Sequence, residues 1–179
     1  FICAALVFSL VGCFYTPYDP NAINGELKNT APSLAHLFGT DNFGRDVFSR
    51  VMKGAGTTFL VGLSVVTAGA VGGCLLGAFT GYFGGKADLI LMRVNDAIAA
   101  IPSILLALVF VGVFGSGTVQ LIAALGILFI PSFARVVRSG FLVQKELDYV
   151  KNARLMGAGH LRIMFVHILP NLKSSLFSA

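Results

Sequence analysis

The sequence carries little charge and has no tryptophan. Only 12% of its 179 residues are charged, whereas 56% are hydrophobic, and the mean hydropathy is +0.84. A typical water-soluble domain has about 25% charged residues, so this composition excludes an ordinary soluble enzyme or binding domain. Cys3, Cys13 and Cys74 lie in apolar stretches without a C-x-x-C pair or other metal-ligand spacing, which favours buried thiols over disulfides and excludes a cysteine metal site. The composition predicts an all-α integral membrane protein.

Long uncharged segments locate the membrane spans. Residues 54–85 and 97–134 contain no charged side chain, and each segment exceeds the ~20 residues that a helix needs to cross the hydrocarbon core. A turn at Gly115-Ser116-Gly117 divides the second apolar region into a helical hairpin of about 89–114 and 118–138. Residues 1–15 are predicted to be a truncated first membrane helix. We therefore expect a polytopic helical bundle.

The distribution of charge predicts the orientation. Residues 135–173 carry seven basic and two acidic side chains, whereas residues 15–50 carry three basic and four acidic ones. Basic residues near span ends favour the cytoplasmic side. We therefore expect residues 139–173 to form a cytoplasmic loop, and residues 16–53 to be extracytoplasmic.

One predicted span carries glycine at every fourth position. These glycines are Gly69, Gly73, Gly77, Gly81 and Gly85. Residues four apart lie on one helix face, where the absence of side chains lets another backbone approach closely. The spacing predicts a helix-packing ridge rather than a chemical site.

Charged residues precede a proline at the inner end of the next predicted span. We expect Asp96 to be interfacial and to pair with Arg93. Pro102 is expected to kink this helix.

The extracytoplasmic segment contains a compact polar motif. It comprises Gly39, Thr40, Asp41, Gly44, Arg45 and Asp46. The following residues 47–53 have the pattern of a short amphipathic helix lying at the membrane interface, with Asp46 and Arg50 spaced i,i+4. No nucleophile accompanies the carboxylates, so we expect capping and ion-pairing roles for Asp41 and Asp46.

The basic loop is predicted to contain two short amphipathic helices. Residues 144–156 contain good helix formers and end at Gly157, a typical C′ residue. A second helix is expected over about 161–168, stopping before Pro170. Such a loop could lie on anionic lipid or dock into a protein, and its mixed charge favours a protein. His160 and His167 lack a third ligand, so we expect surface or packing roles for them.

Three motifs in this chain resemble one family of transport proteins. They are Phe38-Gly39-Thr40-Asp41 with Gly44-Arg45-Asp46, then Gly81-Tyr82-Phe83-Gly84-Gly85, and then Asp148-Tyr149-Val150-Lys151-Asn152-Ala153-Arg154 with Gly157-Ala158 and His167-Ile168-Leu169-Pro170-Asn171. The last motif resembles the EAA loop of the inner-membrane permease subunits of ABC importers. The first two resemble the DppC- or OppC-like half of the dipeptide/oligopeptide/nickel branch. The EAA triplet itself stands here as Lys151-Asn152-Ala153.

The resemblance implies a type I ABC importer (MetI-like) permease fold with six membrane helices. About four of them would be present, with residues 54–179 forming an incomplete permease domain, so the chain resembles a fragment lacking both ends. The family would pair this subunit with a second, DppB/OppB-like permease, an extracytoplasmic substrate-binding protein and two cytoplasmic ATPases. The residues that the family implies for coupling to the ATPases are Asp148, Tyr149, Lys151, Asn152, Ala153, Arg154, Gly157, Ala158, Leu169 and Pro170.

The chain is not expected to be an enzyme or to bind a cofactor, a metal or nucleic acid. It has no G-x-x-x-x-G-K-[ST] motif, because Ala87 follows Gly85-Lys86 where the hydroxyl residue belongs. ATP is therefore expected to be hydrolysed by partner subunits.

Several alternatives stay open at this stage. A nickel permease of the same family shares these motifs. An intramembrane enzyme would use Asp96, His160 or His167 with a hydroxyl such as Ser103 or Thr118, yet no predicted span contains a histidine. An ion-coupled carrier would be expected to show ionisable residues in mid-span. Peptide import is the preferred function.

Overall fold

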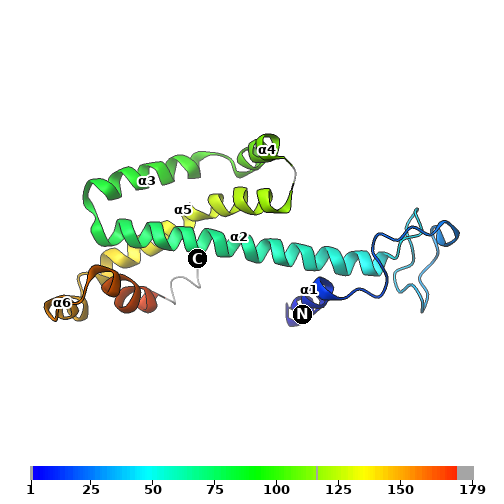
Figure 1. Ribbon diagram of the computed structural model, residues 1–179, viewed down its shortest axis with the longest axis horizontal. Helices are drawn as coiled ribbons and strands as arrows, with labels where there is room; N and C mark the ends of the chain where they lie inside the picture. Colours follow the sequence, from blue (N-terminus) through cyan, green and yellow to red (C-terminus); the bar gives the residue numbers. More distant parts are fainter. Residues whose placement is uncertain (1, 116, 173–179) are drawn as a thin grey trace. The chain divides into compact units, whose positions relative to one another are not determined.

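The structure, a computed structural model, describes residues 2–115 and 117–172. In chain order its elements are α1 (Ile2–Phe14), η1 (Gly25–Leu27), α2 (Val47–Phe83), α3 (Gly85–Ala100), α4 (Ser103–Phe114), α5 (Thr118–Gln144), α6 (Asp148–Leu155), α7 (His160–Arg162), η2 (Ile163–Ile168) and η3 (Leu169–Leu172) (Figure 1). Within the described ranges there is no β-strand, and the Thr40–Asp46 bridge is isolated. The predicted all-α fold is therefore confirmed. Ser116 of the predicted turn and Lys173 lie outside the described residues.

Two helices are long and apolar enough to cross a membrane. They are α2 and α5, and α3 with α4 adds a third span if this bent pair is one crossing. At about 1.5 Å per residue, the 37 residues of α2 extend over ~55 Å, more than the ~30 Å hydrocarbon core. The chain divides into two compact units, residues 1–63 and 64–179, and the division falls inside α2.

The predicted single helix over 89–114 is wrong. It consists of α3 and α4, which meet at an 89° bend. Ile101 and Pro102 at the break both have extended ψ angles, of 126° and 127°. Pro102 has no N–H and its ring clashes with the preceding turn, so the helix stops and the N–H of Ile101 bonds back to the carbonyl of Ile98 at 3.2 Å. The proline that was expected to kink this span therefore divides it.

The separate interfacial helix predicted for residues 47–53 is also incorrect, because these residues form the first turns of α2. The glycines that follow do not stop the helix, since they are used in packing. A Cβ at Gly56 would lie 2.6 Å from the backbone nitrogen of Cys13, and one at Gly12 would overlap the carbonyl of Met52. The amphipathic pattern thus reflects contact between α1 and the start of α2 in the first unit.

In the second unit, α2 packs on α5 along the glycine ridge. A Cβ at Gly77 would lie 2.5 Å from the carbonyl oxygen of Ala134, and one at Gly81 would lie 2.6 Å from the Cβ of Phe141. Gly69 and Gly73 are equally close to α5. At these four positions α2 and α5 are so close that only the hydrogen atom of a glycine fits between them.

Gly85 does not belong to this ridge, contrary to the sequence-based expectation. It is the first residue of α3, has φ +65°, and a Cβ there would meet nothing within 4 Å. The four-residue spacing of glycines continues to Gly85, but α2 ends before it, at Phe83. Gly84, with φ +64°, and Gly85 turn the chain from α2 into α3.

The buried face of α3 is polar and packs against α5. Its buried residues are Asp88 and Asn95. Asp88 accepts two hydrogen bonds from the guanidinium of Arg138 on α5, at 2.6 and 2.7 Å. The predicted pair between Arg93 and Asp96 does not occur among the ion pairs of the described residues. α3 is instead held to α5 by the bidentate ion pair between Asp88 and Arg138.

The loop that follows α5 rests on an apolar base formed by the ends of α2 and α5. Tyr82 of α2 and Val137 and Phe141 of α5 are buried in this base, and the loop adds Val150 of α6 and Ile168 of η2 to the same cluster. The second loop helix was expected to stop before Pro170, but one irregular helix runs from His160 to Leu172 through α7, η2 and η3. Pro170 is the second residue of the 3₁₀ turn η3.

Candidate functional site

The first loop helix, α6, ends in a Schellman turn at Gly157. The N–H of Gly157 bonds to the carbonyl of Arg154 and the N–H of Ala158 bonds to the carbonyl of Ala153, both at 3.0 Å. Gly157 has φ +85°, a conformation that costs other residues about 1–2 kcal/mol. This turn sets the direction in which the chain leaves α6.

Tyr82 joins the end of α2 to both helical parts of the loop. Its hydroxyl lies 2.9 Å from Nδ1 of His160, and Arg154 donates to it at 3.4 Å. Nearby, the ammonium of Lys145 donates to the carbonyl of Gly81 in the last turn of α2, at 3.0 Å. Side-chain hydrogen bonds therefore hold the loop to the end of α2, in addition to its chain connection to α5.

The outer surface of the loop exposes apolar side chains. Leu155 is 86% exposed and Met156 is 88% exposed. Beside them is a recess of about 330 Å³, which is lined by Ala153, Met156, Gly157, Ala158, Arg162 and His167. Exposed apolar groups around a recess are typical of a surface that another protein covers.

The predicted coupling residues separate into an outer and an inner set. Ala153, Gly157 and Ala158 line the recess, and Asp148, Lys151, Asn152 and Arg154 are exposed around α6. Tyr149, Leu169 and Pro170 are half-buried; Tyr149 and Leu169 pack against the apolar base, and the Tyr149 hydroxyl donates to Gln144 at 2.8 Å. Lys151 and Asp148 approach to 3.9 Å, an exposed contact worth at most ~1 kcal/mol.

The polar motif of residues 39–46 forms one hydrogen-bonded turn in the first unit. The carboxylate of Asp41 accepts from the backbone N–H of Phe43 at 2.8 Å and of Arg45 at 3.0 Å, and it pairs with the side chains of Arg45 and Arg50. The Thr40 hydroxyl accepts from the N–H of Thr30 at 2.9 Å. These contacts close the loop that precedes α2.

Glycine is required at two positions of this motif. Gly39 and Gly44 have φ of +72° and +77°, and a Cβ at either would overlap a backbone carbonyl, of Thr30 and Asn24 respectively. The motif spacing therefore reflects the fold of the turn.

Asp46 and Arg50 are spaced i,i+4 but do not pair, because Arg50 turns to Asp41. Asp46 caps the start of α2 by accepting from the N–H of Ser49 at 2.7 Å, and it contacts Nδ1 of His36 at 2.9 Å. Burial raises the pKa of Asp46, but the bonds from Ser49 and His36 outweigh it and hold the pKa below its ordinary value. The partners of Asp46 in its capping and pairing contacts are thus Ser49 and His36.

Asp41 predicts how this loop responds to acid. Burial raises the pKa of its carboxyl, but the N–H groups of Arg45 and Phe43 and the Arg45 guanidinium lower it from 3.8 to about 2. Because the folded form holds the anion, its stabilisation is complete above the unfolded pKa and is lost as pH falls from about 4 towards 2. Amide hydrogen exchange in residues 39–46, corrected for intrinsic rates, should be constant above pH 5 and rise below pH 4.

Replacing Asp41 with asparagine is expected to open this loop at neutral pH. Asp41→Asn should raise trypsin cleavage at Arg45 several-fold, whereas Asp19→Asn, whose carboxylate accepts from the nearby N–H of Asn21, should leave it unchanged. Equal cleavage of both variants would contradict the central role of Asp41.

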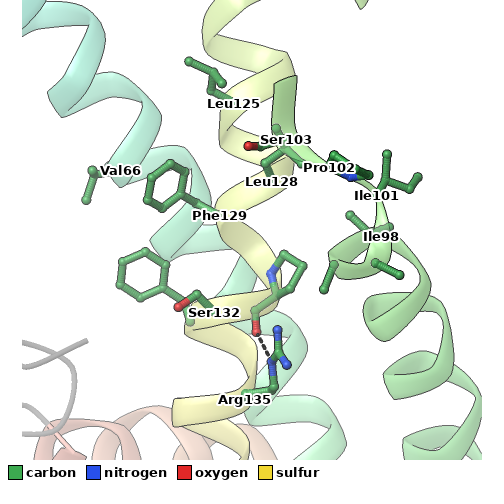
Figure 2. A pocket seen from close by; sticks show the side chains of 14 residues that line it. Val66, Ile98, Ile101, Pro102, Ser103, Leu125, Leu128, Phe129, Ser132 and Arg135 are labelled. Carbon is green, nitrogen blue, oxygen red and sulfur yellow. Dashed lines mark hydrogen bonds between the residues drawn. The ribbon is translucent and has the colours of Figure 1, made fainter. Parts of the chain in front are cut away.

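A cavity of about 760 Å³ lies in the second unit beside the break between α3 and α4 (Figure 2). We call it the helix-break cavity. Its lining consists of Val66, Ile98, Ala99, Ala100, Ile101, Pro102, Ser103, Leu125, Leu128, Phe129, Pro131, Ser132, Phe133 and Arg135. Most of the lining is apolar, and its polar side chains are Ser103, Ser132 and Arg135.

The sequence of the second unit shows to which protein family the chain belongs. The profile of the binding-protein-dependent transport system inner membrane component matches residues 73–179, more than half of the chain. The chain belongs to this family. This binding-protein-dependent inner-membrane component is therefore a multi-pass membrane protein, and the resemblance to ABC importer permeases is confirmed.

Relatives of this inner-membrane component are named as transport permeases. The glutathione transport system permease protein GsiD of Pectobacterium atrosepticum is 40% identical over 177 residues, covering 98% of this chain and 59% of the relative. GsiD of an Escherichia coli strain is 41% identical over 177 residues, with 98% and 58% covered. A Brucella suis protein named as a peptide transport system permease is 44% identical over 157 residues, with 88% and 53% covered. The chain thus spans somewhat more than half the length of these relatives.

Sequence reasoning missed two residues that fix the loop and α3 of this family member. Tyr82 lies within a recognised motif, but its partner His160 is 78 residues away. Asp88 lies just before the helix predicted for about 89–114, and its partner Arg138 is 50 residues away. Neither pair has a local spacing that would reveal it.

Proposed function

We propose that this chain is part of a permease subunit of an ATP-driven importer for peptides. It would form half of the translocation path with a second, similar permease and receive its substrate from an extracytoplasmic binding protein. Two cytoplasmic ATPases would drive it through the loop at residues 148–171. The family membership and the relatives named as glutathione and peptide permeases support this function.

The single observation that carries the coupling role is the construction of the loop. α6 and its Schellman turn present exposed Leu155 and Met156 beside a recess, while the opposite side rests on the ends of α2 and α5. A partner that moves this surface would therefore move membrane helices. The excess of basic residues in 135–173 supports a cytoplasmic position for it.

ATP hydrolysis would belong to the partners. The sequence lacks a phosphate-binding G-x-x-x-x-G-K-[ST] motif, so we propose no nucleotide site on this chain. A partner ATPase that closes on ATP would bias the loop between two positions, and the attached spans would follow.

Reconstitution tests this function. The full-length permease, its partner permease, both ATPases and the binding protein are placed in proteoliposomes, and uptake of a radiolabelled tripeptide is measured with and without ATP. We expect uptake that requires ATP, both ATPases and the binding protein. Uptake of Ni²⁺ instead of peptide would favour the nickel branch, and uptake driven by an ion gradient without ATPases would contradict the proposal.

A further inference from the structure

The helix-break cavity has the size and composition of a small-molecule site. Its volume of about 760 Å³ lies within the ~300–1,000 Å³ typical of ligand pockets, which are mostly apolar with few polar groups. One wall is the non-helical backbone at Ile101 and Pro102. Within a membrane segment, such backbone is tolerated where it is buried in protein or lines a water-filled cavity.

The opposite wall is formed by α5 and contains Arg135. Its Nε donates to the carbonyl of Pro131 at 3.2 Å, the bond that is drawn as a dashed line at Arg135 in Figure 2. This bond uses one of the five N–H groups of the guanidinium. Among the described residues no carboxylate lies within ion-pair distance of Arg135.

Arg138, three residues later on the same helix, differs in this respect. Its guanidinium is held by both oxygens of Asp88, at 2.6 and 2.7 Å. Asp96 and Arg93 line a neighbouring recess together with Arg135, without an ion pair to it. Arg135 is the one charged side chain that lines this cavity, and it has no acidic partner among the described residues, so it is the group of this cavity that can bind an anion.

We propose that the helix-break cavity holds the terminal carboxylate of a peptide during passage, with Arg135 as its anchor. The free guanidinium N–H groups bind the carboxylate, Ser132 and Ser103 offer further hydrogen bonds, and the apolar wall receives the peptide side chains. This inference rests on the proposed function and names the chemical group that the path recognises. An anionic lipid headgroup offers the same charge and is distinguished by the test below.

The test compares a peptide with its amide. The reconstituted full-length transporter is supplied with the radiolabelled tripeptide Ala-Leu-Ala, and separately with the same peptide ending in a carboxamide. Arg135→Gln should lower uptake of the acid about tenfold, as expected for loss of a charge-assisted bond worth ~1.4 kcal/mol or more, and should leave uptake of the amide unchanged. The readout is the ratio of acid uptake to amide uptake, compared between the variant and the wild type. The same binding protein is used in all measurements, so its own preference for acid or amide does not affect this comparison.

Two further variants separate recognition from folding. Arg135→Lys keeps the charge and should restore part of the uptake of the acid. Arg93→Gln removes a cation that lines the neighbouring recess but not this cavity, and it should leave the ratio of acid to amide uptake unchanged.

Each remaining outcome overturns this inference. Equal loss of acid and amide uptake in Arg135→Gln would indicate a structural role. A loss that follows the fraction of anionic lipid in the vesicles, rather than the peptide terminus, would assign Arg135 to a lipid. Wild-type vesicles that import neither peptide would instead refute the proposed function itself.

Discussion

Replacing Gly77 with leucine is expected to abolish assembly of the protein in the membrane. Even a Cβ at this position would lie 2.5 Å from the carbonyl oxygen of Ala134 and 2.8 Å from the Cβ of Val137. The first of these atoms is backbone, so it cannot move aside without displacing α5. Overpacking of a well-packed core costs about 1–3 kcal/mol for added methylenes, and leucine adds three carbons beyond the Cβ.

The same helix provides the control. Gly62 also lies in α2, but a Cβ there would meet nothing within 4 Å. Gly62→Leu should therefore accumulate at the wild-type level, whereas Gly77→Leu should lose most of the folded protein in size-exclusion and thermal-stability measurements of the full-length permease with its partner. Equal accumulation of both variants would mean that the α2–α5 contact does not hold the fold together.

Replacing Gly157 with valine is expected to weaken binding of the ATPases and thereby to lower transport. Valine is strongly disfavoured at φ +85°, so the Schellman turn should open and Ala153 and Met156 should leave their places beside the recess. Since Gly157 lies outside the candidate membrane spans, the variant should still insert. We expect loss of ATPase co-purification together with at least tenfold lower transport. Ala153→Asp, which places a charge at the recess, should have a similar effect.

Gly159→Val is the matched control for this turn. Gly159 has φ −68° and ψ 157°, which suit a β-branched residue, and a Cβ there meets nothing within 4 Å. It should bind the ATPases like the wild type. If Gly157→Val also did so and kept substrate-stimulated hydrolysis, the loop at 148–171 would not be the coupling element.

Local patterns were read correctly where the helix itself carries the information. The four-residue spacing of Gly69 to Gly81 places these residues on one face, because residues four apart lie above one another on any α-helix. Gly157 was recognised as a C′ residue because a left-handed position after a helix favours glycine. Both features depend only on residues that are close together in the chain.

Features that depend on where an element ends, or on distant partners, were not predicted. The amphipathic pattern of residues 47–53 is the same whether the helix stops or continues into α2, and Gly85 fits the ridge spacing although α2 has already ended at Phe83. The helix-break cavity requires α3, α4 and α5 to be placed together. Hydrophobic periodicity contains no information on such placement.

The contact made by Tyr82 limits how these transporters can be rebuilt from parts. In this protein the residues at positions 154 and 160 both bond to Tyr82. A graft of residues 148–172 from a relative would replace the first two residues but keep the original residue at position 82. The smallest exchangeable cassette is therefore discontinuous, consisting of the loop together with the last turn of α2. Substitutions at these three positions are correspondingly expected to be inherited as a set, so that a change acceptable in one homologue is harmful in another.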